Sequence, residues 1–253
     1  MATIIRYSVF RYSPSRISGE SINLGVLLYD PETDNREFRC TKKYGRISKF
    51  DDTLNINDVK LLLNSVKEDA EQNLFNIGKK FDINEYTRRF DSNYYFDRIK
   101  TLEYSTSFEE VCERIFKTYF RFDFPMSERP SSRDDINLLK DLLSSRCNET
   151  VEKDQYITGV CNDRAKYDIL TDEYCIKVFN FDGKELSRVI DNAKVWAWNG
   201  NHSNGSRTPI VIYRYNSEKN VDDNFQIIKS IFKEAGIRFY GIEEGMDYLQ
   251  KTS

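Results

Sequence analysis

The sequence contains few of the residues that build common catalytic and metal sites. Its single histidine, His202, excludes motifs with two histidine ligands, and any histidine-based catalytic triad would have to use that residue. The five cysteines include no C-x-x-C pair, so the spacing does not indicate a structural zinc site. Cysteines spread in this way are typical of reduced thiols, and we expect a cytoplasmic protein.

Phosphate-binding loops and membrane segments are missing as well. Neither G-x-x-x-x-G-K-[S/T] nor G-x-G-x-x-G occurs, which removes the usual support for kinase, P-loop NTPase and dinucleotide-dependent functions. No run approaches the roughly 18 consecutive apolar residues of a membrane helix. The opening MATIIRYSVFRY has no apolar core of a secretory signal. We therefore expect no membrane partner.

The composition is that of a folded protein without an excess of positive charge. Hydrophobic residues make up 39% of the 253 residues and aromatic residues 14%, which is enough to build a packed core. The formal net charge of −3 does not favour non-specific binding of nucleic acid by the whole molecule. A nucleic-acid site would have to be a local basic patch.

Hydrophobic periodicity in the first half of the chain predicts an antiparallel sheet with helices. The expected strands are 3–12, 22–29, 36–41 and 93–104, the first three forming a meander. Apolar residues at helical spacing predict a helix at 57–75, and a capping box of Ser107 and Glu110 opens another that ends near Tyr119. The Pro- and Ser-rich stretch FPMSERPSSR separates an α+β domain, 1–125, from a second domain, 131–253.

The second half of the chain predicts an αβββαβ core followed by a further helix and strand. The expected elements are a helix at 133–147, strands at 155–161, 167–171 and 174–181, a helix at 185–199 with a C-cap at Asn199-Gly200, a strand at 209–215, a helix at 222–235 and a strand at 237–242. Strands joined through helices pair in parallel, so the sheet is expected to be mixed. The whole chain is therefore assigned to the α+β class.

The opening RYSVFRYSP…GESINLGVLLYDP resembles a bacterial family known only as domain of unknown function 3037. The matching positions are Arg6, Tyr7, Arg11, Tyr12, Pro14, Gly19, Glu20, Asn23, Gly25 and Val26. The resemblance covers about the first half of the chain, and it implies a mobile-element or defence setting without a settled activity. Arg6, Arg11, Glu20 and Asn23 are candidates for one shared polar site, and the alternative is that the motif residues serve the backbone, as Gly25 would by allowing close approach.

The order αβββαβ is similar to the core of restriction-endonuclease-like nucleases. In those enzymes an Asp on the second strand and an (Asp/Glu)-x-Lys on the third strand bind Mg²⁺ or Mn²⁺, and the Lys stabilises developing charge. The resemblance implies Asp168 and Lys177 for the first acid and the Lys, with Glu173 and Glu152 as the other acids. The middle acid is replaced by Cys175, a poor Mg²⁺ ligand. A degenerate core without a cofactor is the alternative.

A basic run between residues 36 and 49 is the best nucleic-acid candidate in the sequence. It contains Arg36, Arg39, Lys42, Lys43, Arg46 and Lys49, against the single acid Glu37. Such a run could neutralise several phosphates, although a charge run is more often a solvated face. Trp198 in KVWAWNG is expected to be exposed and is a candidate contact, whereas Trp196 falls on the apolar helix face.

The leading function is a non-catalytic interaction protein in a bacterial or phage defence or counter-defence setting. Its expected partner is a protein or a nucleoprotein, because the catalytic motif is incomplete and the net charge is acidic. The first alternative is a divalent-metal-dependent nuclease using Asp168, Glu173, Lys177 and Glu152. The second is an accessory subunit of a kinase-like or toxin system.

Overall fold

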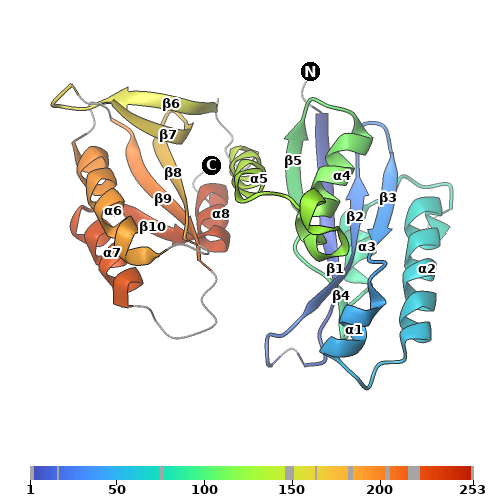
Figure 1. The fold of residues 1–253 in the computed structure, drawn as a ribbon. Coiled ribbons are helices and arrows are strands. Elements are labelled where there is room, and N and C mark those ends of the chain that lie inside the picture. The colour runs from blue at the N-terminus through green and yellow to red at the C-terminus, as the bar shows by residue number, and fades with distance from the viewer. Residues whose placement is uncertain are drawn as a thin grey trace. The chain divides into compact units, whose positions relative to one another are not determined.

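The computed structural model describes residues 3–15, 17–74, 77–145, 151–162, 164–181, 185–202, 206–215 and 223–251. The chain divides into two compact units, which comprise residues 1–135 (unit 1) and 136–253 (unit 2) (Figure 1). Helix α5, Ser132–Ser144, contains the residue at which this division falls. None of the helices in the described ranges is long and apolar enough to cross a membrane.

Unit 1 is built on an antiparallel sheet with β1 in its interior. The strands are β1 (Thr3–Tyr12), β2 (Ile22–Tyr29), β3 (Arg36–Cys40), β4 (Tyr94–Phe96) and β5 (Lys100–Tyr104). The order is β3-β2-β1-β4, and β5 also pairs with β1, so the predicted meander is confirmed. The single strand predicted at 93–104 is wrong, because two short strands pair with opposite ends of β1.

Helices close the core of unit 1. They are α1 (Tyr44–Phe50), α2 (Ile56–Gln72), α3 (Ile83–Arg88) and α4 (Phe108–Tyr119), followed by the 3₁₀ turns η2 (Arg121–Asp123) and η3 (Met126–Glu128). The predicted capping box of Ser107 and Glu110 is present at α4. Apolar residues of α2 pack with Phe10 and Phe38 of the sheet, and α4 buries Val111 and Ile115. Burial of these periodic apolar faces is the main source of helix stability.

Unit 2 contains a mixed sheet, as predicted. After α5 come β6 (Glu152–Thr158), β7 (Arg164–Leu170), β8 (Tyr174–Asn180), α6 (Leu186–Asn201), β9 (Thr208–Arg214), α7 (Asp223–Glu234), β10 (Arg238–Gly241) and α8 (Ile242–Lys251). The strand order is β10-β9-β8-β7-β6. The pairs β6–β7 and β7–β8 are antiparallel, and β8–β9 and β9–β10 are parallel. Helices α6 and α7 supply the crossovers that parallel pairing requires (Figure 1).

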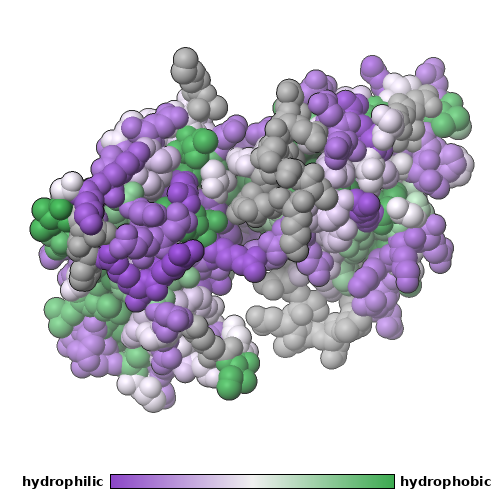
Figure 2. All heavy atoms as spheres, turned by 180° about the vertical axis from the view of Figure 1, so that it is seen from behind, coloured by the Kyte–Doolittle hydropathy of each residue, from purple (hydrophilic) through white to green (hydrophobic). Residues whose placement is uncertain are grey.

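The core of unit 2 brings α6 and α7 together with the parallel strands. Val189, Ala193, Ile228 and Phe232 belong to one buried cluster with Val211 of β9. On the face drawn in Figure 2, hydrophobic side chains form small separate areas among hydrophilic ones. That distribution is expected when the large apolar side chains are enclosed in the cores.

One predicted helix end in unit 2 differs from the structure, and one predicted helix start lies outside the described residues. The predicted C-cap at Asn199-Gly200 is wrong, because α6 continues to Asn201. Gly200 is buried, and a Cβ there would lie 2.6 Å from Ile237 Cδ1, so this glycine allows close packing and does not end the helix. The first residue of the helix predicted at 222–235 lies outside the described residues.

Candidate functional site

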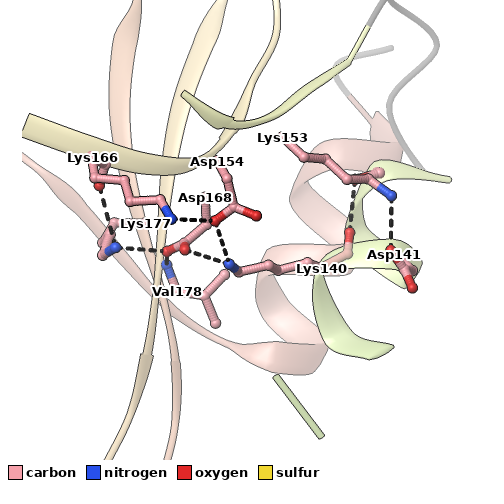
Figure 3. Close-up of polar contacts among 9 residues, drawn as sticks. Lys140, Asp141, Lys153, Asp154, Lys166, Asp168, Lys177 and Val178 are labelled. Carbon is pink, nitrogen blue, oxygen red and sulfur yellow. Dashed lines mark hydrogen bonds and ion pairs between the residues drawn. The ribbon is translucent and has the colours of Figure 1, made fainter. Parts of the chain in front are cut away.

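The acid and the lysine of the nuclease-like motif lie next to each other in unit 2. Asp168 is on β7 and Lys177 is on β8, and the Lys177 Nζ atom is 3.0 Å from Asp168 Oδ2 (Figure 3). The Lys177 ammonium also lies 4.6 Å from the ring centre of Trp196 on α6. The lysine is therefore held between a carboxylate and an aromatic face.

The carboxylate of Asp168 is buried and fully engaged. Only 5% of the residue is exposed. Its Oδ1 atom lies 2.7 Å from Lys140 Nζ of α5, and its Oδ2 atom also accepts the backbone N–H of Val178 at 2.8 Å. Two ammonium groups and an amide therefore surround one carboxylate, the arrangement that compensates a charge removed from water.

Lys140 joins Asp168 to a second aspartate on the neighbouring strand. Its Nζ atom also donates to Asp154 Oδ1 of β6 at 3.0 Å, and Lys166 of β7 reaches the same oxygen at 3.0 Å (Figure 3). We call Lys140, Asp154, Lys166, Asp168 and Lys177 the lysine–aspartate cluster. It contains three cations and two carboxylates, so its formal charge is positive.

The backbone is irregular where the cluster forms. Ladder pairs run from Lys153 with Ile169 to Gln155 with Tyr167, leaving Asp154 and Asp168 outside the ladder at this point. Asp154 has a φ of 55°, a left-handed conformation that Asp tolerates better than most residues. A break in β6–β7 pairing thus coincides with the position where both carboxylates meet Lys140.

The ion pairs of the cluster favour the charged forms of Lys140 and Asp154. Hydrogen bonds from Lys140, then from Lys166, lower the pKa of Asp154 below its ordinary value. Burial opposes the ammonium of Lys140, but hydrogen bonds to Asp168 and Asp154 outweigh burial and raise the pKa of Lys140. The Lys140 ammonium is therefore a stable partner of both carboxylates at neutral pH.

The residues at the positions of the nuclease-like motif do not fit a divalent cation, because such a cation needs several oxygen ligands. Cys175 stands at the middle-acid position, and burial raises the pKa of its thiol to about 11, so it stays protonated at neutral pH. Glu173 precedes β8 and lies four residues before Lys177, about 13 Å along an extended strand. Glu152 is exposed and is the first residue of strand β6. In the part of the chain that the structure describes, no group of three His, Cys, Asp or Glu residues could hold a metal ion.

The sequence did not reveal Lys140, Asp154 or Lys166 as members of this site. Lys140 is on the helix that precedes the three strands, and it reaches Asp168 only through tertiary packing. A signal was available in β7, where Lys166 and Asp168 alternate and so face the same side of a strand. The helix residue could not be paired with them without the fold.

The four polar candidates of the N-terminal motif have separate partners. Arg6 donates to Asn84 Oδ1 of α3 at 3.0 Å, and Arg11 forms an ion pair with Asp97 at 2.9 Å. Asn23 lies opposite Arg11 across β1–β2 and donates to the Tyr119 carbonyl at 3.2 Å.

Glu20, the fourth candidate, is exposed between β1 and β2, where its backbone carbonyl accepts the Ser13 hydroxyl. The structure thus brings Arg11 and Asn23 together, whereas Arg6 has its partner on α3.

The basic run contains two kinds of cation. Arg39 is surrounded by Glu37, Glu109 and Glu113, each at 2.7 Å. Burial opposes its charged form, but the hydrogen bonds to Glu37 and Glu109 outweigh burial and raise the pKa of Arg39. Arg36 is 2.9 Å from Asp34. The remaining members are exposed: Lys42, Lys43, Arg46 and Lys49. Charges already neutralised by carboxylates have little to offer a phosphate.

Trp198 is 54% exposed on α6, as predicted, and its ring stacks on that of His202 with centroids 3.7 Å apart. Trp196 is the partly buried tryptophan of this helix, and it packs against Tyr167 and Phe179. The two indoles therefore have the different environments that helical periodicity indicated.

Comparison with known proteins gives a match for part of the chain. A search of curated proteins and a search of solved structures each found no significant match. A family model does match the N-terminal part, across β1 to β5 and most of α4. Residues 7–116 match the model described as "Protein of unknown function (DUF3037)", which confirms that this part of the chain is similar to that uncharacterised family.

Proposed function

We propose that this protein is a non-catalytic interaction protein whose nuclease-like carboxylate serves in a structural ion-pair cluster. The observation that carries the proposal is the position of Lys140. Its Nζ atom lies 2.7 Å from Asp168 and 3.0 Å from Asp154, between two carboxylates of neighbouring strands. An ammonium in that place supplies positive charge without any open coordination position for a substrate phosphate.

Exchanging Lys140 for a metal ion would be unfavourable. The side chain of Lys140 is 11% exposed, so expelling it from Asp168 would leave a buried ammonium without its partner unless the helix also moved. The protonated Cys175 thiol offers little in return, because Mg²⁺ prefers oxygen. Such a core is better suited to holding a surface in shape than to hydrolysing a phosphodiester.

A metal-dependent nuclease is the second candidate, favoured by the closeness of Asp168 and Lys177. An acid and a lysine 3.0 Å apart on neighbouring strands match the pair that such enzymes use. This function requires Lys140 to leave the carboxylates when substrate and metal bind. The two candidates therefore differ in what Asp168 contacts in the working state.

The first experiment incubates the purified protein with labelled single- and double-stranded DNA and RNA, with Mg²⁺ or Mn²⁺ or with EDTA. We expect no cleavage that depends on metal. An Asp168→Ala/Lys177→Ala variant is the control. Metal-dependent cleavage by the wild type that this variant lacks would overturn the proposal in favour of the nuclease.

A second measurement tests Lys140 directly by Mn²⁺ titration calorimetry. The wild type should show no binding at this site, and Lys140→Gln should gain weak binding because Asp154 and Asp168 lose their shared cation. Lys166→Gln is the matched control, since it contacts Asp154 only and leaves the Lys140–Asp168 pair in place. Mn²⁺ binding to the wild type that Asp168→Ala abolishes would contradict the structural role of Lys140.

The proposal includes a protein or nucleoprotein partner in a bacterial or phage conflict setting. Support for that setting comes from the family resemblance, which carries no chemistry of its own. The experiment is affinity capture of partners from an infected and an uninfected host lysate. A variant of this protein with a changed surface is the control. Equal recovery in both lysates, with no partner lost in the variant, would count against it.

A further inference from the structure

An exposed phenylalanine in unit 1 lies beneath two arginine side chains. Phe122 belongs to the turn η2 and is 56% exposed. The guanidinium carbons of Arg46 and Arg129 are each 5.2 Å from the centre of its ring. The two cations reach the ring from segments far apart in the sequence, and more than half of the residue still faces solvent.

The surroundings of Phe122 hold this arrangement in place. The next residue, Asp123, accepts the Thr41 hydroxyl at 2.6 Å and the Lys42 backbone N–H at 3.1 Å, which ties η2 to the segment before α1. Its other oxygen lies 3.5 Å from Arg46 Nη1. Arg129 Nε donates to the Phe124 carbonyl at 3.1 Å. Both guanidinium groups are thus positioned by contacts that leave further N–H donors for a ligand.

Three of the exposed members of the basic run lie near this turn in the chain segment that Asp123 binds. Lys42 and Lys43 immediately precede α1, and the Arg46 side chain is 42% exposed. Arg36 and Arg39, in contrast, belong to carboxylate ion pairs on β3. We call Lys42, Lys43, Arg46, Phe122 and Arg129 the Phe122 surface.

We infer that the Phe122 surface binds single-stranded nucleic acid. The part of the Phe122 ring that the two guanidinium groups leave exposed offers a surface on which an unpaired base can stack. The arginine planes over the ring add to stacking and pair with phosphates. A duplex keeps its bases stacked on one another, so it can use the cations but not the ring. The lysine–aspartate cluster of unit 2 has no part in this binding.

The test is fluorescence anisotropy with short labelled oligo-dT and oligo-U in EDTA at low salt. We expect a dissociation constant of about 10⁻⁶ to 10⁻⁴ M, the range of sequence-independent binding. Four cations on phosphates give a slope of about −3 in a plot of log K against log salt, at roughly −0.7 for each phosphate. A duplex of the same length should bind more weakly, because it cannot stack on Phe122.

Variants separate stacking from charge. Phe122→Ala should weaken binding by about 5- to 150-fold without changing the salt slope, and Phe122→Trp should retain it. Lys42→Ala/Lys43→Ala should make the slope less steep by about 1.4. Leu61→Ala, which removes another exposed apolar side chain of unit 1, is the matched control and should bind as the wild type does.

Two results would overturn the inference. One is wild-type affinity in Phe122→Ala, which would mean that charge alone binds the strand. The other is failure of every oligonucleotide to bind at about 10⁻³ M, well above the expected constant, which would leave a protein as the partner of this surface. Because EDTA is present throughout, metal-dependent cleavage by unit 2 would overturn the proposed function without affecting this binding.

Discussion

Lys140 Nζ lies 2.7 Å from Asp168 Oδ1, and the two side chains are 11% and 8% exposed. When Lys140 is replaced with Met, the remaining partners of the Asp168 carboxylate are the Lys177 ammonium and one backbone amide. We expect a loss of about 2–4 kcal/mol in the free energy of unfolding, because a buried carboxylate loses one of its two cations. Urea denaturation followed by circular dichroism measures it.

The control is Lys166→Met. Lys166 is 44% exposed and pairs with Asp154, itself 49% exposed, so its loss should change the free energy of unfolding by less than about 1 kcal/mol. Similar small effects of both substitutions would show that the Lys140–Asp168 pair is not a main support of unit 2.

The pH dependence of stability follows from the same two partners. The pKa of Lys140 is raised above 10.5, so the pair contributes fully below that value and its contribution is lost as pH rises through the folded-state pKa. The pKa of Asp154 is lowered below 3.8, so its contribution is present above that value and is lost as pH falls through the folded-state pKa. We expect thermal melting temperatures to form a plateau between about pH 5 and pH 9.

Lys140→Met tests the alkaline limb. Its deficit in melting temperature relative to the wild type should be constant across the plateau and should shrink at strongly alkaline pH, where the wild-type lysine deprotonates. A deficit that grows with pH has the opposite sign and would contradict the raised pKa.

Gly25 of the N-terminal motif is expected to be required for packing. A Cβ at this position would lie 2.4 Å from Cζ of Phe38, whose ring is completely buried. Gly25→Ala should therefore destabilise unit 1 by about 1–3 kcal/mol through overpacking. Gly45→Ala in α1, where a Cβ meets nothing within 4 Å, should be neutral or stabilising by up to about 1 kcal/mol. Chemical denaturation of the pair distinguishes packing from a general effect of alanine.

Arg39 and Lys43 are close in sequence but should respond oppositely to substitution. Arg39→Met leaves three carboxylates, Glu37, Glu109 and Glu113, without their shared cation and should cost about 1–3 kcal/mol of stability, because the part-buried hydrogen bonds of Arg39 to Glu37 and Glu113 are lost. Lys43→Met should change stability by less than about 0.5 kcal/mol.

Affinity for single-stranded oligonucleotides should change in the reverse order, falling in Lys43→Met and staying near the wild-type value in Arg39→Met. Parallel denaturation and anisotropy measurements check the pair. A lower affinity in Arg39→Met alone would place phosphate binding at Arg39 and would contradict the predicted role of Lys43.

Elements with strong periodicity or caps were predictable from the sequence. Strands β1, β2 and β3, and helix α2, lie close to the predicted ranges. Three helices were missed. Helix α1 has no side-chain N-cap and only seven residues, α3 has six, and α8 follows β10 without a loop. Helices as short as α1 and α3 show too few turns for periodicity to stand out, and their stability comes from tertiary packing.

The candidate sites were less predictable because their partners are distant in sequence. The basic run predicted six comparable cations, but Glu109 and Glu113 of α4 neutralise Arg39 from some 70 residues away. The nuclease-like motif predicted Asp168 and Lys177, and Lys140 entered only through the packing of α5. Electrostatic partners are set by the assembled fold, which local patterns describe only in part.

Both tryptophans of the chain, Trp196 and Trp198, lie on α6 of unit 2. Fluorescence excited where tyrosine does not absorb therefore comes from one half of the molecule alone. The indole of Trp196 lies 4.6 Å from the Lys177 ammonium. The emission wavelength of Trp196 should therefore respond to the electric field around Asp168. Tryptophan emission can thus follow the unfolding of unit 2 without a contribution from unit 1, and without any label or added chromophore.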